Sequence, residues 1–203
     1  MAAVLALTAT DFDAAAARLG VATPILRAVH EVETAGGNGF LEAGKPVILF
    51  EGHVFWRQLE MRGIPPAALA EGNENILYPR WNREHYRGGV REYARLARAL
   101  RIHEEAALCA TSWGMFQLMG FNHEVCGYEH VVDFVQAMCC SPGEQLEAFV
   151  CFVRKRGLVR YLQCRDWEGF ARRYNGPGFA LNRYDEKLRR AYERFAAGKE
   201  PPG

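Results

Sequence analysis

The sequence PILRAVHEVETAGGNGF, residues 24–40, decides how the rest of this chain is organised. Thr23 can cap the start of a helix, and Pro24 suits the first helical position because no backbone N–H is needed there. The glycines at positions 36, 37 and 39 do not sustain a helix. We therefore predict a helix that begins at Pro24 and ends near Thr34.

One glutamate of this helix is predicted to lie on its apolar face. At a period of about 3.6 residues, Glu33 falls within a stripe of apolar side chains: Ile25, Leu26, Val29 and Val32. Burial raises the pKa of a carboxyl group, and the negative end of the helix dipole raises it further. Such a group stays protonated near neutral pH and can act as a general acid. The alternative is that Glu33 lies at the edge of the stripe and reaches water.

The composition fits one globular domain. With 203 residues, 49% of them hydrophobic and 24% charged, the chain can bury a core without disulfides. The net charge of +1 hides an asymmetry, because residues 1–150 hold 12 basic and 18 acidic side chains and residues 151–203 hold 13 and 6. The basic C-terminal part favours an anionic partner, such as a cell-wall polymer, lipid headgroups or nucleic acid. Solvated helix faces produce the same bias.

Neither export nor membrane insertion is predicted. Residues 1–12, MAAVLALTATDF, lack the basic start and the long apolar run of a signal peptide. No segment approaches the roughly 20 apolar residues of a membrane span. We expect a soluble chain made in the cytosol, with free thiols at its six cysteines: Cys109, Cys126, Cys139, Cys140, Cys151 and Cys164.

The remaining pattern is mostly helical with one short strand. A capping box of Thr10 and Asp13 is expected to open a helix that ends at Gly20. The apolar run KPVILF, residues 45–50, predicts a strand, and the mixed segment 64–87 predicts a long loop. Further helices are expected at residues 53–61, 89–100, 104–112, 129–139, 143–156, 166–174 and 184–197. No repeat or linker divides the chain, so we predict one α+β domain over residues 1–203.

Two further segments stand out from the helical pattern. In TSWGMFQLMG, residues 111–120, Gly114 permits the close approach of another backbone or of a ligand. Gln117 is flanked by apolar residues, so burial would oblige its amide to find hydrogen-bond partners, which a purely structural network also supplies. RYNGPG, residues 173–178, ends a helix and forms a turn for conformational reasons alone.

No metal or cofactor site is predicted. His-Glu pairs occur at residues 30–31, 103–104 and 123–124, but none has the second histidine of a zinc protease motif four residues after the first. The remaining candidate ligands do not have the spacing of a standard zinc site: His123, Cys126, His130, Cys139 and Cys140. The chain also lacks a phosphate-binding glycine loop, a dinucleotide fingerprint and a nucleophile elbow.

Four segments, taken in order, resemble the N-acetylmuramidase family of phage endolysins and bacterial prophages, within the lysozyme-like superfamily. The segments are VETAGGNGF (32–40), PVILFEGHVFWRQL (46–59), SWGMFQLMGFN (112–122) and YNGPG (174–178). The resemblance extends over residues 10–195. It implies an α+β, predominantly helical fold, in which a cleft separates two lobes.

The resemblance also implies roles for individual residues. Glu33 would be the catalytic acid, in agreement with its place on the helix. Ser112 and Gln117 would line the cleft, and Tyr174 and Asn175 would contact the N-acetyl group of the sugar or the acid. Lytic transglycosylases usually have a serine after the acid, whereas Thr34 follows Glu33 in this chain, so the role of that hydroxyl group stays open.

The expected reaction is cleavage of the β-1,4 bond between N-acetylmuramic acid and N-acetylglucosamine in peptidoglycan, with Glu33 protonating the glycosidic oxygen. Glu51, after the predicted strand, is the candidate second carboxylate, with His53 as a positioning group. Glu51 could equally well stabilise the start of the next helix through its charge. The alternatives are a lytic transglycosylase that forms 1,6-anhydro products, a chitinase, and a non-catalytic wall-binding protein.

The remaining expectations also follow from the resemblance. The partner would be the glycan strands of peptidoglycan, with no nucleic acid, no stable membrane insertion and no cofactor, and the protein would be a monomer. Many family members have a separate wall-binding module, which this chain lacks, so the catalytic domain would itself bind the polymer. The protein would wait in the host cytoplasm and act on periplasmic peptidoglycan once the inner membrane is permeabilised.

Overall fold

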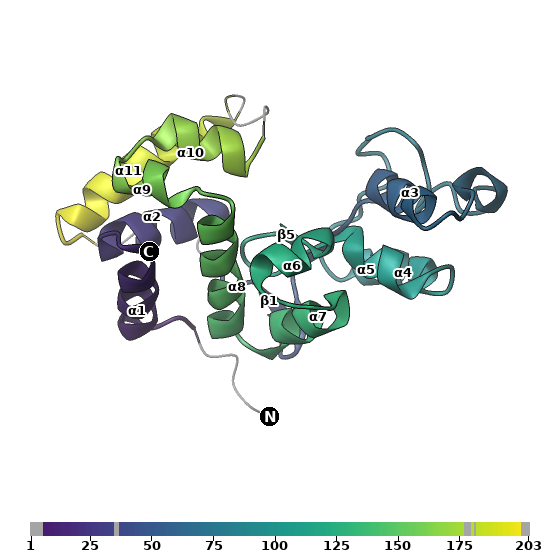
Figure 1. Ribbon diagram of the computed structural model, residues 1–203, viewed down its shortest axis with the longest axis horizontal. Coiled ribbons are helices and arrows are strands. Elements are labelled where there is room, and N and C mark those ends of the chain that lie inside the picture. Colours follow the sequence, from purple (N-terminus) through teal and green to yellow (C-terminus); the bar gives the residue numbers. More distant parts are fainter. Residues whose placement is uncertain (1–5, 35–36, 177–179, 181, 200–203) are drawn as a thin grey trace.

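The computed structural model describes residues 6–34, 37–176, 180 and 182–199 (Figure 1). Its helices are α1 (Ala9–Leu19), α2 (Thr23–Thr34), α3 (Gly52–Met61), α4 (Arg91–Leu100), α5 (Glu104–Cys109), α6 (His123–Cys126), α7 (Val131–Cys140), α8 (Pro142–Lys155), α9 (Val159–Gln163), α10 (Trp167–Tyr174) and α11 (Tyr184–Ala196). Its strands are β1 (Phe40–Glu42), β2 (Lys45–Pro46), β3 (Ile48–Phe50), β4 (Thr111–Trp113) and β5 (Leu118–Met119). Short 3-10 turns lie at Pro66–Leu69 and Gly120–Asn122. This mainly helical fold with small antiparallel sheets confirms the predicted α+β class.

The helices form two groups, with the strands between them (Figure 1). In one group α2 packs against α1 and α11, and α11 packs on α10. In the other group α5 packs against α3 and α4, and α4 also contacts β3. α8 lies between α1 and the pair formed by α6 and α7, and contacts all three. This arrangement agrees with the two-lobed outline that the resemblance implied.

The predicted strand at residues 45–50 is divided at Val47. Lys45 and Pro46 pair with β1, whereas β3 pairs with β4 in a second antiparallel sheet of order β3-β4-β5. The backbone of Val47 joins the two sheets, because its N–H donates to Gly39 O and its carbonyl accepts from the N–H of Gly114. Strands of two or three residues show too little alternation to be predicted, which is why β1, β4 and β5 were missed.

The start of α1 corrects the predicted capping box. The box consists of Thr8 and Asp11, because the helix begins earlier than expected: the Thr8 backbone N–H donates to Asp11 Oδ2 at 2.7 Å. Asp13 instead accepts a hydrogen bond from the Thr23 hydroxyl at 2.6 Å, and Thr23 is the first residue of α2 rather than its cap. The end of α1 at Gly20, which is left-handed with φ of 62°, is as predicted.

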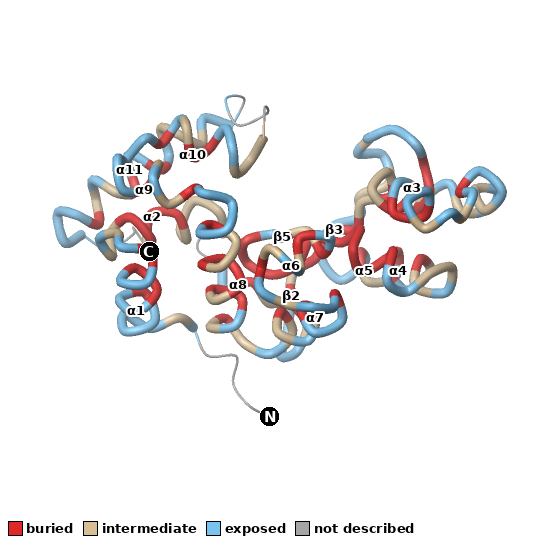
Figure 2. The backbone as a smooth tube through the Cα atoms, in the orientation of Figure 1, coloured by how far each residue is buried: buried red, intermediate tan, exposed pale blue. Residues whose placement is uncertain are grey.

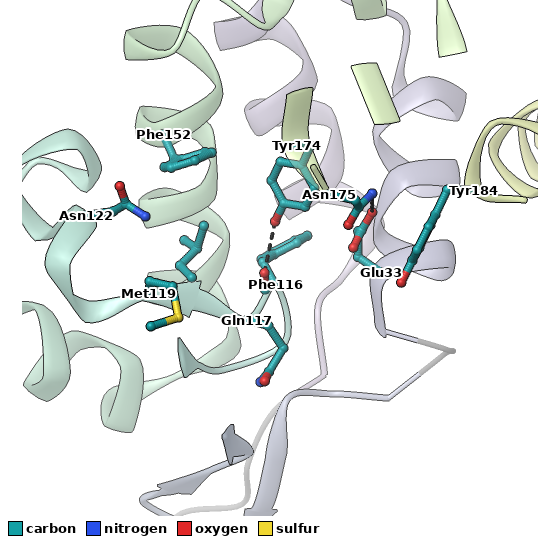
Figure 3. A pocket seen from close by; sticks show the side chains of 10 residues that line it. Glu33, Phe116, Gln117, Met119, Asn122, Phe152, Tyr174, Asn175 and Tyr184 are labelled. Atoms are coloured by element: carbon teal, nitrogen blue, oxygen red, sulfur yellow. Dashed lines mark hydrogen bonds between the residues drawn. The ribbon is translucent and has the colours of Figure 1, made fainter. Parts of the chain in front are cut away.

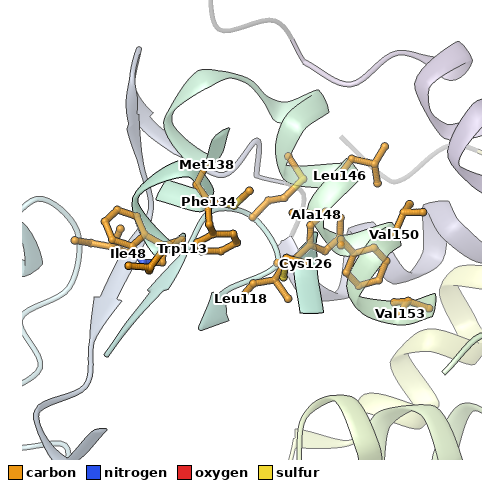
Figure 4. Close-up of a cluster of buried hydrophobic side chains, with 14 of the residues drawn as sticks. Ile48, Trp113, Leu118, Cys126, Phe134, Met138, Leu146, Ala148, Val150 and Val153 are labelled. Carbon is orange, nitrogen blue, oxygen red and sulfur yellow. The ribbon is translucent and has the colours of Figure 1, made fainter. Parts of the chain in front are cut away.

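One hydrophobic core connects the sheet with the helices around it, and its buried residues extend into both groups of helices (Figure 2). The inner side chains of the sheet, Ile48, Trp113 and Leu118, lie beside Phe134 of α7 (Figure 4). α8 also contributes its buried face to this cluster, which includes Leu146, Ala148, Val150 and Val153. One face of the sheet therefore packs on the hydrophobic core, and the candidate site lies on the side of the opposite face.

Gly114 has the close contact that the sequence predicted, but the neighbour is neither a backbone nor a ligand. A Cβ at this left-handed position would lie 2.5 Å from the carboxamide of Gln145. Gln145 is 1% exposed, accepts from the N–H of Met115 at 2.7 Å and donates to Met138 O at 2.8 Å. The turn that precedes β5 is thereby fixed to α7 and α8.

Among the residues that the structure describes, no helix is long and apolar enough to cross a membrane. The same residues include no group of three His, Cys, Asp or Glu side chains placed to hold a metal ion. All six cysteines lie among these residues and are free thiols, as predicted. The helices α6 and α9 were missed by the sequence analysis, because each spans at most five residues.

Candidate active site

Glu33 lies at the end of α2 and lines a cavity of about 320 Å³ (Figure 3). The other lining residues come from the β4–β5 turn and β5, from the 3-10 turn at Gly120–Asn122, from α8, from the end of α10, and from α11: Phe116, Gln117, Leu118, Met119, Asn122, Phe152, Tyr174, Asn175 and Tyr184. A second cavity of about 180 Å³, lined in part by the glycine turn after α2, shares Glu33 and Gln117 with the first. The carboxyl group of Glu33 therefore lies where two neighbouring cavities meet.

The environment of Glu33 favours its protonated form. The side chain is partly buried, and burial raises its pKa from the usual 4.5 to about 7. Asn175 Nδ2 donates to Glu33 Oε1 at 3.3 Å, and this hydrogen bond lowers the pKa of Glu33, although less than burial raises it. Glu31, two residues earlier, instead accepts a hydrogen bond from Arg194 of α11. The two glutamates of α2 thus have different partners.

The hydroxyl group of Thr34, whose role the sequence left open, donates to His30 O at 2.8 Å. This bond within α2 closes the last turn of the helix below Glu33. Burial lowers the pKa of His30 to about 4, so this histidine is neutral near pH 7.

Gln117 is fixed by hydrogen bonds on both ends of its amide. The hydroxyl of Ser112 donates to Gln117 Oε1 at 2.8 Å, and Gln117 Nε2 donates to Gly114 O at 2.8 Å. The backbone of Gln117 is left-handed with φ of 47°, a strained conformation for a residue other than glycine. Ser112 is 5% exposed and lies behind Gln117, so it contacts the cavity only through that side chain.

Tyr174 forms one wall of the cavity with its ring. The ring stacks on Phe170 at 5.4 Å and meets Phe149 and Phe152 edge to face. Its hydroxyl donates to Phe116 O at 2.9 Å (Figure 3). Burial, reinforced by the charge of Glu33, raises the pKa of Tyr174 well above 10. Tyr174 therefore connects α10 to the β4–β5 turn.

Glu51 and His53 lie at the start of α3, outside both cavities that Glu33 lines. Glu51 precedes the helix, but its side chain makes no capping hydrogen bond and instead accepts from the hydroxyl of Tyr86. His53 Nδ1 lies 3.3 Å from Glu51 Oε2, and burial lowers the pKa of this histidine. Tyr86 belongs to the segment 64–87 that was predicted as a long loop, but nothing in the sequence relates this tyrosine to Glu51.

The register of the sheet nevertheless relates Glu51 to the Glu33 cavity. Leu49 pairs with Ser112, and residues directly opposite in antiparallel strands point to the same face. Leu49 and Glu51 are two residues apart, so they also share a face, while Phe50 between them is fully buried. Ser112 on that face bonds to Gln117, which lines the Glu33 cavity. Leu49, Ser112 and Glu51 therefore share one face of the sheet, and Ser112 connects that face to the Glu33 cavity through Gln117.

A partly buried carboxyl group that lines a cavity, in a two-lobed helical domain, is consistent with a lysozyme-like glycoside hydrolase. Comparison with known proteins gives the family. The N-acetylmuramidase family model matches residues 22–196, so the chain belongs to the N-acetylmuramidase family. This membership confirms the resemblance found in the sequence and makes the protein a peptidoglycan hydrolase of the muramidase type.

A solved structure supports the same assignment. The crystal structure of Burkholderia AP3 phage endolysin superposes with a TM-score of 0.87 at 45% sequence identity. The match covers 95% of this chain and 72% of the endolysin chain. No curated protein sequence matches this chain.

Proposed function

We propose that Glu33 is the general acid of this muramidase and protonates the glycosidic oxygen between N-acetylmuramic acid and N-acetylglucosamine. The observation that supports this role is the partly buried carboxyl group, with a pKa of about 7, at the meeting point of two cavities. An acid with a pKa near the working pH is protonated often enough to donate and acidic enough to do so readily. Bond cleavage then proceeds through an oxocarbenium-like transition state.

The neighbouring residues are proposed to bind and orient the sugar. Asn175 holds Glu33 and has a carboxamide group in the cavity that matches the N-acetyl group of the substrate. The Tyr174 ring offers a wall for the sugar. Gln117 presents its side chain between the two cavities, and Ser112 is a positioning residue that acts through Gln117.

Glu51 is the proposed second carboxylate, with His53 and Tyr86 as its positioning groups. Its place on the same face of the sheet as Ser112 and its hydrogen bond from Tyr86 support this role. A carboxylate about 5 Å from the acid would act as a nucleophile, and one roughly 6.5–9.5 Å away would activate water. Without a second carboxylate, the 6-hydroxyl of the sugar would attack and leave a 1,6-anhydro product.

Mass spectrometry of the fragments released from purified peptidoglycan, with and without borohydride reduction, tests this proposal. Reducible muramic acid ends are expected from the wild-type protein. Glu51→Gln is expected to lower their release by roughly a hundredfold if this residue acts on the water or the sugar. Anhydro ends that resist reduction would show a transglycosylase that does not need Glu51. Absence of any glycan cleavage would contradict the proposed role of Glu33.

Asn175→Ala is expected to move the alkaline limb of the pH profile. The acid acts in its protonated form, so kcat/KM should fall as pH rises through about 7. The Asn175 hydrogen bond lowers the pKa of Glu33, so its loss should shift this limb to higher pH, measured as kcat/KM against pH. Asn122→Ala is the matched control, since Asn122 lines the same cavity, and its limb should stay near 7. A limb that moves downward in Asn175→Ala would contradict the assignment.

The remaining proposals concern the whole protein. We propose a monomer whose catalytic domain, matched over residues 22–196, itself binds the glycan strands. It would be held in the host cytoplasm and reach periplasmic peptidoglycan after the inner membrane is permeabilised. Light scattering of the purified protein tests the monomer, and fractionation of infected cells before and after membrane permeabilisation tests the release.

A further inference from the structure

A third cavity, of about 410 Å³, continues the one that contains Glu33. Asn122 and Phe152 line both cavities. Figure 3 shows these two side chains at the end of the first cavity that is remote from Glu33 and Tyr184. Beyond them the third cavity is completed by Phe121, Leu158, Arg156 and Arg173. The cavity that contains Glu33 and this basic cavity therefore adjoin each other.

The positive charge of the third cavity is not neutralised by the protein. Arg156 donates to Asn122 Oδ1 at 2.6 Å, and Arg173 lies over the ring of Tyr161 at 4.5 Å. Arg173 also donates a long hydrogen bond, 3.4 Å, to Gly169 O. Within the described part of the chain, neither guanidinium group forms an ion pair with a carboxylate, and both residues are exposed to solvent. Both groups are thus available to an anionic ligand.

The cavity also has an apolar wall beside the two charges. Phe121 is 43% exposed, which is unusual for a phenylalanine ring, and Leu158 lies buried beneath the cavity. An apolar surface next to two guanidinium groups fits an extended chain that has both aliphatic parts and carboxylates. A neutral sugar could accept hydrogen bonds from these arginines, but only an anionic group would also balance their charge.

We propose that this cavity binds the stem peptide attached to the muramic acid residue of the substrate. The inference rests on the proposed function, because that function brings the glycan to Glu33. In peptidoglycan the lactyl carboxyl group of muramic acid is bound in an amide, so the free carboxylates of the substrate belong to the peptide. Arg156 and Arg173 form charge-assisted hydrogen bonds with these carboxylates, and Phe121 contacts the aliphatic side chains.

Arg173→Gln tests the proposal through substrate preference. Activity is measured on peptide-bearing glycan strands and on the same strands stripped by an amidase that cuts between the lactyl group and the peptide. The ratio of kcat/KM on the first substrate to kcat/KM on the second is expected to fall roughly tenfold in Arg173→Gln, the effect of losing one charge-assisted hydrogen bond. The fall should be smaller at high salt, since exposed charges are screened.

Arg172→Gln is the matched control. Arg172 is the preceding residue of α10, pairs with Glu168 and does not line the cavity. The control changes the net charge by the same amount, so its ratio should equal that of the wild type. An unchanged ratio in Arg173→Gln, or an equal loss on both substrates, would overturn the proposal.

A binding measurement separates this proposal from the proposed reaction. Stripped strands retain a lactyl carboxylate, so binding of a synthetic stem peptide, L-alanyl-D-isoglutamyl-diaminopimelyl-D-alanine, is also measured by calorimetry. The wild type and Arg172→Gln should bind this peptide, and Arg173→Gln should bind it roughly tenfold more weakly. If the wild type cleaves neither substrate, the role of Glu33 fails, while equal peptide binding by all three proteins overturns the stem-peptide cavity.

Discussion

Glu33→Gln is expected to lower the rate of glycan cleavage by roughly a thousandfold, because general acid catalysis contributes on the order of 10²–10⁴ to such reactions. The amide has nearly the same shape as the carboxylic acid and retains a group that can bond to Asn175, but it cannot donate a proton to the glycosidic oxygen. The measurement is the release of reducing ends from purified peptidoglycan. Residual activity within tenfold of the wild type would contradict the role of Glu33 as the acid.

Glu31→Gln provides a matched control on the same helix. Glu31 bonds to Arg194, and no cavity that contains Glu33 is lined by it. The substitution leaves the proposed acid in place, so cleavage should remain close to the wild-type rate. A loss comparable to that of Glu33→Gln would mean that the packing of α2 against α11, rather than proton donation, limits the reaction.

Glu33→Gln, which lowers activity, should raise the stability of the folded protein. A carboxyl group whose pKa is about 7 in the folded state and 4.5 when exposed binds more protons folded than unfolded. It therefore costs no stability below about pH 4.5, and its cost grows as pH rises towards 7 and is complete above it. Glu33→Gln removes this cost, on the order of 3 kcal/mol at pH 8. Denaturation at pH 8 and pH 4 should show a more stable variant only at pH 8.

The part of the site that could be predicted is the part determined by local periodicity. The apolar stripe of α2 depends on residues three and four apart, so the sequence placed Glu33 on the inner side of the helix. In the structure this side chain is partly buried, and burial raises its pKa. Asn175 was identified only through the family resemblance, because a turn of Asn and Gly occurs in many proteins for conformational reasons.

Contacts between distant segments could not be predicted in this way. Ser112 of β4 forms a hydrogen bond with Gln117, which immediately precedes β5. Both strands are very short, and β4 also pairs with β3, which lies far earlier in the chain. Tyr86 meets Glu51 across 35 residues, and no pattern in either segment indicates the other. The basic bias of residues 151–203 was visible in the sequence, but only the fold shows that Arg156 and Arg173 share one cavity.

Among the variants considered, Glu92→Ala is expected to lose the most stability, about 3–5 kcal/mol. The substitution leaves the buried guanidinium group of Arg95 without its carboxylate partner. Glu92 is fully buried and accepts a hydrogen bond from Arg95 Nη1 at 2.7 Å. Arg95 is 3% exposed and also donates to Phe50 O at 2.9 Å and to Asn75 O. Urea denaturation measures the loss as a shift in the free energy of unfolding.

Glu168→Ala is the control for an exposed pair. Glu168 bonds to Arg172 on the surface of α10, where both side chains are about 60% exposed. Such pairs contribute at most about 1 kcal/mol, so this variant should unfold nearly as the wild type does. Replacing both charged groups together, Glu92→Leu with Arg95→Met, should cost less than Glu92→Ala alone, because no unpaired charge stays in the core.

The buried pair also fixes the end of the strand that leads to the proposed second carboxylate. Glu92 Oε2 accepts from the N–H of Phe50 at 3.3 Å, and Arg95 binds the carbonyl of the same residue. Phe50 immediately precedes Glu51, so both backbone bonds set where the Glu51 side chain begins. Glu92→Ala should therefore reduce cleavage even at temperatures where the variant is folded. The pH at which kcat/KM falls, which reports the pKa of Glu33, should stay near 7. A folded variant with full activity would show that this strand end is not needed for the reaction.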